Sequence, residues 1–274
     1  MDLSHIIQTS AKIQISAFNG AGLSNQLYIL IKGIAMSIFS GKHRLFVGKF
    51  LTQINTTRRV RASSVISFHH TNAYLAKKYN IVLVDEIPHH KHMHMVEEIS
   101  PHMDDVMTTP IGKDIYNHLR FHPNIASPPL TFVTTILKSH PAGRTNVVHL
   151  RLESDGITHW SKMNDMTADS FRDRLADKYI AMIAKHVSKT DPTFVLTGDE
   201  DNPVIDYMKT NGYHYHIFKK PTRYREINAI MDMVIGRTCT NVFIGAGGST
   251  FSQLLNIYLT NVPSTHLLDL NHID

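Results

Sequence analysis

The sequence predicts an α/β fold of parallel sheets with helices on both faces. Short apolar runs that suit buried strands alternate with segments whose apolar residues recur at helical spacing. The chain opens with a strand, a glycine-rich turn, a helix and a second strand, over residues 12–48. Polar residues follow the ends of several predicted strands, at the edge where parallel sheets bind ligands. Together these features predict two doubly wound halves around a cleft.

The first half of the chain contains few clear elements. Its opening residues predict a strand over 12–18, a loop over 19–24, a helix over 25–40 that Gly41 ends, and a strand over 44–48. Between residues 50 and 142 the patterns predict only a strand over 81–84 and a helix over 113–121, because Pro123, Pro128, Pro129 and Pro141 interrupt helical periodicity. We therefore place the domain boundary in this proline-rich stretch, between residues 140 and 141.

The second half is more regular. We predict strands over 147–150, 193–196, 213–218 and 242–244. We predict helices over 168–188, starting near Thr167 or Asp169, and over 203–210, 226–237 and 250–259. This alternation indicates a parallel sheet that is covered on both faces.

Composition indicates a soluble globular protein. The 274 residues are 42% hydrophobic and 19% charged, and a chain of this length can bury a large core. Cys239 is the only cysteine, which excludes an internal disulfide and a cysteine-based zinc site and favours a reducing compartment. The start lacks the pattern of a signal peptide, and Lys32 interrupts the longest apolar stretch, so we expect a cytoplasmic protein without a membrane span.

The net charge of +5 suits an anionic ligand such as a nucleotide or a phosphorylated sugar. Nucleic acid is a poorer candidate, because the basic residues form no stripe and aromatic residues make up only 8%. Four of the nineteen histidines, His89, His90, His92 and His94, lie close together but at irregular spacing. We expect an exposed segment there and no metal site.

The segment His149–Asp155 carries the strongest chemical signal. It follows an apolar run that predicts a buried strand, so Arg151, Glu153 and Asp155 emerge together where this strand ends. The planar guanidinium of an arginine can donate two parallel hydrogen bonds to a phosphate. A carboxylate two or four residues later could accept the proton of a reacting hydroxyl. The segment therefore predicts a phosphate clamp with an adjacent base.

Two glycine-rich loops are candidate anion sites. Residues 19–26 combine Gly20 and Gly22 with a helix start, which suits close approach of a ligand as well as an ordinary capped turn. Residues 245–252 combine three glycines with Ser249 and Thr250 at a predicted helix start. Three glycines exceed what a helix cap needs, so this second loop favours a diphosphate site.

Three further charged residues have a functional and a structural interpretation. Asp199 follows a predicted strand and could bind a ribose or a base, or could cap the next helix. Asp232 lies in an apolar helix and could hold a nucleobase, or could face solvent or pair with Arg237. Arg223, just before that helix, could reach a diphosphate or could be solvated.

Three of these segments together resemble the fucosyltransferase-like glycosyltransferases of the GT-B fold. The resemblance is to the protein O-fucosyltransferase branch and its plant relatives, which include rhamnosyltransferases. The segments are the loop with Asn-Gln at 19–26, the His-Leu-Arg motif at 149–155, and the Phe-Ile-Gly and Gly-Ser-Thr-Phe-Ser motifs within 243–252. Asp232 also falls where the family carries an aspartate.

The resemblance implies two Rossmann-like domains facing a cleft, an acceptor-side domain over 1–140 and a nucleotide-sugar-binding domain over 141–274. It also implies an inverting transferase that needs neither a metal nor a cofactor. Arg151 would bind the leaving diphosphate, and Asp155 would be the general base, with Glu153 as second candidate. The other donor-binding residues would be Gly20, Gly22, Asn25, His149, Asp199, Arg223, Asp232, Gly248, Ser249, Thr250 and Phe251.

The resemblance leaves the substrates open. GDP-fucose is the family's default donor, and a UDP-sugar such as xylose or rhamnose is the alternative, because Leu152 and Ser154 replace the family's usual aromatic and basic residues. The acceptor would be a hydroxyl of a glycan or a protein. Many family members carry a membrane anchor and disulfides, which this sequence lacks, so we expect a bacterial or viral protein. A sugar- or nucleotide-binding module without catalysis is the alternative from another class.

Overall fold

A computed structural model describes residues 13–15, 22–53, 58–85, 94–95, 104–140 and 143–273. The chain divides into two compact units, one formed by Met1–Ser127 with Thr222–Ile230 and the other by Pro128–Pro221 with Met231–Asp274. These units differ from the predicted ranges of 1–140 and 141–274 in two places. The division falls within helix α5 (Pro123–Lys138), and a short later segment belongs to the first unit.

The second unit contains a five-stranded parallel sheet. Its strands are β7 (Asn146–His149), β8 (Thr193–Leu196), β9 (Tyr215–His216), β10 (Val242–Ala246) and β11 (Ser264–Leu268). They lie in the order β11-β10-β7-β8-β9. The chain therefore winds outward from β7 in one direction and then from β10 in the other. In such sheets ligands bind at the carboxyl ends of the two strands where the order reverses, which here are β7 and β10.

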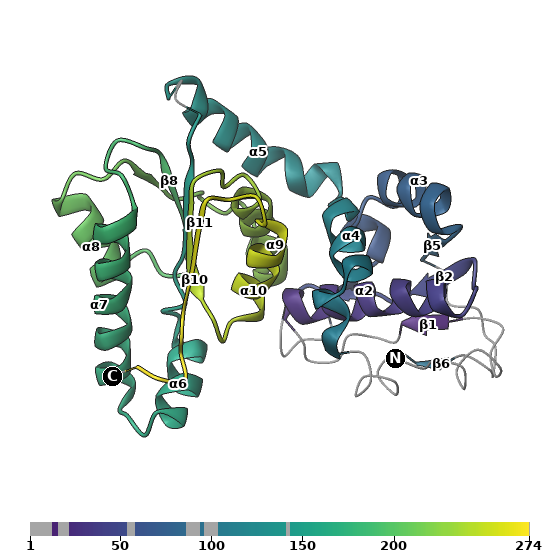
Figure 1. The fold of residues 1–274 in the computed structure, drawn as a ribbon, viewed down its shortest axis with the longest axis horizontal. Helices are drawn as coiled ribbons and strands as arrows, with labels where there is room; N and C mark the ends of the chain where they lie inside the picture. Colours follow the sequence, from purple (N-terminus) through teal and green to yellow (C-terminus); the bar gives the residue numbers. More distant parts are fainter. Residues whose placement is uncertain are drawn as a thin grey trace. The chain divides into compact units, whose positions relative to one another are not determined.

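Helices cover both faces of this sheet (Figure 1). On one face lie α7 (Ala168–His186) and α8 (Pro203–Thr210), and α6 (Ser154–Met163) packs against α7 at the lower end of the sheet in this view. On the other lie α10 (Thr250–Tyr258) and the second half of α9 (Arg225–Gly236). This arrangement confirms the parallel sheet covered on both faces that the alternating patterns predict.

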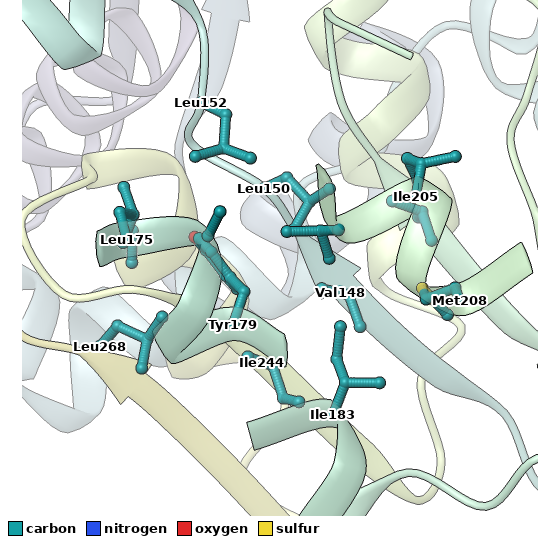
Figure 2. Packing of buried hydrophobic residues seen from close by; sticks show 14 of the residues in the cluster. Val148, Leu150, Leu152, Leu175, Tyr179, Ile183, Ile205, Met208, Ile244 and Leu268 are labelled. Atoms are coloured by element: carbon teal, nitrogen blue, oxygen red, sulfur yellow. The ribbon is translucent and has the colours of Figure 1, made fainter. Parts of the chain in front are cut away.

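The core of the second unit lies between the sheet and α7 and α8. Figure 2 shows Val148 and Ile244 from the sheet beside Ile183 of α7 and Met208 of α8, and all four side chains are buried. Burial of one such side chain stabilises a fold by roughly 1.5–3 kcal/mol. The strands that position the candidate site are therefore held by continuous apolar packing.

The first unit contains a four-stranded parallel sheet in the order β5-β2-β1-β6. Its strands are β1 (Ile13–Ile15), β2 (Arg44–Val47), β5 (Val82–Val84) and β6 (His94–Met95). Its helices include α2 (Leu23–Phe39), α3 (Phe68–Tyr79) and α4 (Pro110–His118), with short 3-10 segments η1 (Ala62–Ser64) and η3 (Asp104–Thr108) and an antiparallel pair, β3 (Phe50–Leu51) and β4 (Arg59–Val60). Gly41 follows α2 with a φ of +63°, in agreement with its predicted role at the helix end.

Most elements predicted for the second half are confirmed, and the bounds of β8 and α8 agree with the prediction. The sequence patterns do not predict α3, α6 or β11. The prediction that the prolines after residue 122 break helices is wrong, because Pro128 and Pro129 lie inside α5. Each proline removes one backbone donor. Tertiary packing supports the helix nevertheless, because the ring of Phe132 in α5 lies against Phe194 and Phe218, with ring centroids 5.9 and 5.3 Å away.

Among the described residues, the structure contains no helix that combines the length and the hydropathy needed to cross a membrane.

Candidate functional site

Arg151 lies just beyond the carboxyl end of β7. The backbone there is held by Tyr179, a fully buried residue of α7. The Tyr179 hydroxyl donates to the carbonyl of His149 (2.8 Å) and accepts from the amide of Arg151 (3.3 Å). Helix α7 thus fixes the point at which the chain leaves the sheet, and with it the origin of the arginine side chain.

The guanidinium of Arg151 is bound by two carboxylates. Its Nη1 donates to Glu153 Oε2 (2.8 Å) and to Asp155 Oδ1 (3.1 Å), and its Nη2 donates to Asp155 Oδ2 (3.1 Å). The pair with Asp155 is therefore bidentate. Gly156 allows this approach, because a Cβ atom at that position would lie 3.0 Å from Arg151 Cζ. Burial lowers the pKa of Arg151, but the two carboxylates outweigh it, so the pKa is raised and the arginine stays charged.

Glu153 lies between Arg151 and the loop after β8. Its Oε1 accepts from the amide of Gly198 (3.3 Å), and a Cβ atom on Gly198 would lie 3.2 Å from Glu153 Cγ. Burial raises the pKa of Glu153, but the charge of Arg151 outweighs it and the net shift is downward. Glu153 is therefore a carboxylate that is held from two sides.

His149 connects β7 to the first turn of α10. Its Nδ1 lies 2.7 Å from Ser252 Oγ, and that oxygen accepts from the amide of Ala246 (3.0 Å). Burial lowers the pKa of His149 to about 4, and the charge of Arg151 contributes. The ring is therefore neutral at pH 7, and it lies against the ring of Phe251 with centroids 4.6 Å apart.

The glycines of residues 245–248 are needed for packing. A Cβ atom on Gly245 would lie 2.7 Å from Ser252 Oγ, and one on Gly248 would lie 2.5 Å from the indole of Trp160. Ser249 is buried at the start of α10, but its side chain makes no capping hydrogen bond, and Thr250 beside it is half-buried. The loop therefore brings two hydroxyl residues to a helix start, where backbone N–H groups favour anions.

Asp232 forms a mostly buried ion pair. Lys220 Nζ lies 2.8 Å from Asp232 Oδ2 and also donates to the carbonyl of Thr197 (2.6 Å). Burial raises the pKa of Asp232 to about 6, although Lys220 opposes the shift. Sequence reasoning missed Lys220 as the partner and considered Arg237, whose guanidinium lies 4.6 Å from the ring centroid of Tyr258. Because Lys220 precedes α9 by several residues in a polar segment, no periodic pattern could have identified it.

Asp199 is engaged within its own loop and with α7. Its Oδ2 accepts from Arg172 Nη2 (2.7 Å), and its Oδ1 accepts from the amide of Asp201 (3.1 Å). The predicted alternative, a helix cap, belongs to Asn202, whose side chain accepts from the first amides of α8. A cavity of about 410 Å³ lies beside this loop and is lined in part by Glu153, Gly198, Asp199 and Arg172.

The other predicted residues belong to the first unit or lie outside the described part of the chain. Gly22 precedes α2, Asn25 is exposed on α2, and Arg223 is exposed with its guanidinium 5.8 Å from the ring centroid of Tyr224. Gly20 lies outside the described residues. The first amide of α2, at Leu23, donates to the carboxylate of Glu226, a buried residue that sequence reasoning also missed. The protein's own carboxylate thus lies where the glycine-rich loop predicts an anion.

The described residues contain no group of three histidine, cysteine, aspartate or glutamate side chains that could hold a metal. Of the predicted histidine cluster, His94 lies in β6, and His89, His90 and His92 lie outside the described residues.

No protein-family model and no curated protein matches this sequence. Solved structures of fucosyltransferases do match over almost the whole chain. NodZ from Bradyrhizobium is similar with a TM-score of 0.61 and 14% identity, covering 97% of this chain and 97% of that one. POFUT1 in complex with GDP-fucose is similar with a TM-score of 0.57 and 11% identity, covering 95% and 99%. NodZ alpha-1,6-fucosyltransferase soaked with GDP-fucose is similar with a TM-score of 0.58 and 12% identity, covering 93% of this chain and 97% of that one. These similarities confirm the predicted GT-B-like α/β fold.

Proposed function

We propose that this protein is a glycosyltransferase that moves a sugar from a nucleoside-diphosphate donor to a hydroxyl group. One observation supports this most directly. Arg151 lies at the carboxyl end of β7, next to β10 in the sheet, in a fold shared with fucosyltransferases solved with GDP-fucose. The ends of these two strands are where a doubly wound sheet binds nucleotides.

Arg151 would bind the diphosphate and stabilise the charge that grows on it as the sugar departs. A fixed guanidinium can do this without reorganising during the reaction. Ser249 and Thr250 would add hydroxyl donors at the start of α10, whose N-terminus favours anions. This set of donors would let the transferase work without a metal ion.

Asp155 is the first candidate for the base that accepts the proton of the acceptor hydroxyl, and Glu153 is the second. The Asp155 side chain is 47% exposed and that of Glu153 is 27% exposed, so Asp155 is more accessible to an acceptor. Direct attack by a hydroxyl activated in this way would invert the anomeric centre of the sugar.

The donor we propose first is GDP-fucose, and the alternative is a UDP-sugar such as xylose or rhamnose. The partly exposed Lys220–Asp232 pair and the neutral His149 beside Phe251 are the candidate groups of the second unit for contacting the nucleoside. The acceptor would be a glycan or a protein.

A thermal-shift screen with GDP, UDP, ADP and dTDP, each with and without EDTA, tests this function. We expect one nucleotide to raise the melting temperature equally in both conditions. The stabilisation is about 2.7 kcal/mol when the ligand is at 100 times its dissociation constant. If none of the four nucleotides raises the melting temperature, the protein is not a transferase of this kind. If EDTA abolishes the shift, the metal-independent mechanism is wrong.

A further inference from the structure

The carboxylates around Arg151 make the site negative before any donor arrives. Arg151 contributes one positive charge, and Glu153 and Asp155 contribute two negative charges within 3.1 Å of it. Lys220 and Asp232 balance each other nearby, and His149 is neutral. A diphosphate would therefore meet two carboxylates at the arginine that should attract it, and like charges at such short range repel.

We propose that Asp155 occupies the place of the donor phosphate on Arg151 and is displaced when the donor binds. This inference rests on the function proposed above and concerns the same site. The bidentate geometry of the Arg151–Asp155 pair is the geometry that an arginine uses for a phosphate, so one ligand can replace the other on the guanidinium. The exchange breaks the two hydrogen bonds that Arg151 donates to Asp155, and Arg151 then donates two hydrogen bonds to phosphate oxygens.

The surroundings determine which group moves. Gly156 confines the guanidinium on one side. A Cβ atom on Gly156 would lie only 3.0 Å from Arg151 Cζ. Glu153 is held by Arg151 and by the amide of Gly198. Asp155 is the most exposed of the three side chains, so water can solvate its carboxylate after release.

Release would leave Asp155 in a favourable position. It lies in the first turn of α6, where its Oδ1 accepts from the amide of Gly156 (2.9 Å) and a negative charge is stabilised by the helix dipole. A carboxylate that is bound bidentate to arginine has few lone pairs left for a proton. Donor binding would therefore free the candidate base only when the sugar to be transferred is present.

The test is titration calorimetry with GDP, and with inorganic pyrophosphate as a probe of the diphosphate contact alone, on the wild type and three variants. Asp155→Asn removes the competing carboxylate, and we expect it to bind GDP about two- to fivefold more tightly, the range for loss of one exposed charge pair. Glu153→Gln removes the same charge but keeps the bidentate pair, so its gain should be smaller. Asp177→Asn, an exposed change on α7, is the matched control.

The outcomes separate this inference from the proposed function. If Asp155→Asn binds GDP no more tightly than the wild type, or if Glu153→Gln gains as much, displacement of Asp155 is wrong while the transferase proposal stands. If neither the wild type nor any variant binds a nucleoside diphosphate, both proposals fail. Asp155→Ala serves as a second variant, and the melting temperature without ligand shows whether each variant is folded.

Discussion

His149 and Asp232 are buried titratable residues of the second unit whose pKa values are shifted in opposite directions. Burial lowers the pKa of His149 from 6.5 to about 4 and raises that of Asp232 from 3.8 to about 6. In both cases the folded protein favours the uncharged form. The two residues therefore change the stability with opposite sign as the pH changes between about 4 and 6.

For His149 the unfolded chain binds the proton first as the pH falls. The stability that the neutral ring contributes is complete above pH 6.5 and is lost as the pH falls towards 4, by about 3 kcal/mol. His149→Asn keeps an acceptor for Ser252 but cannot be protonated, so we expect this loss to disappear. Urea denaturation between pH 4 and 7 measures it, with His159→Asn as the same substitution at an exposed position. An unchanged pH dependence in His149→Asn would show that the buried ring does not titrate as described.

For Asp232 the folded protein keeps the proton longer as the pH rises. The free energy of unfolding therefore falls by about 3 kcal/mol as the pH rises from 3.8 to about 6, and this contribution does not change above that range. Asp232→Asn removes this loss of stability with rising pH and leaves the opposite pH dependence that His149 causes. We expect the variant to gain stability with rising pH between 4 and 6 more steeply than the wild type. A slope equal to that of the wild type would contradict the raised pKa.

Glu226 joins helix α9 to the start of helix α2 within the first unit. Its carboxylate accepts from the first amide of α2, and the amide of Glu226 donates to the carbonyl of Thr52 (3.2 Å). Glu226→Gln keeps the size of the side chain but removes the charge at the helix N-terminus. We expect a loss of about 1–2 kcal/mol in the free energy of unfolding, measured by urea denaturation. Glu200→Gln, at an exposed position, is the control, and an equal loss in both variants would contradict the role of Glu226.

Local sequence patterns predict some elements of this fold but not the contacts between distant residues. Strand β8 and helix α8 were predictable because their apolar patterns and the Pro203 start are local signals. The contacts of Asp232 with Lys220 and of Leu23 with Glu226 were not, because they join residues that only the tertiary fold brings together. Helix α5 was missed because its two internal prolines outweigh local propensity, whereas packing by Phe132 supports the helix.

The candidate site was predictable in part for the same reason. Arg151, Glu153 and Asp155 were identified because they follow one strand, and the structure confirms that they lie together. The sequence could not show that the two carboxylates bind the arginine, because the same residues are compatible with an arginine whose guanidinium is available to a phosphate.

The candidate donor-binding residues that contact one another belong to the second unit. We expect GDP to slow hydrogen exchange at residues 146–163 and 245–258, which contain Arg151 and the start of α10. Residues 203–210 of α8 should exchange as they do without nucleotide and serve as the internal control. Protection that is absent from residues 146–163 would place the nucleotide elsewhere.

The proposed function depends on Arg151 binding the diphosphate of a sugar nucleotide, and titration calorimetry with GDP in the presence of EDTA measures this contact. Arg151→Ala should weaken binding about ten- to a hundredfold, the range for loss of charge-assisted hydrogen bonds, while the variant stays folded. Arg174→Ala, an exposed arginine of α7, should bind as the wild type does. If Arg151→Ala binds GDP with the affinity of the wild type, the diphosphate does not lie at the end of β7 and the proposed role of Arg151 is wrong.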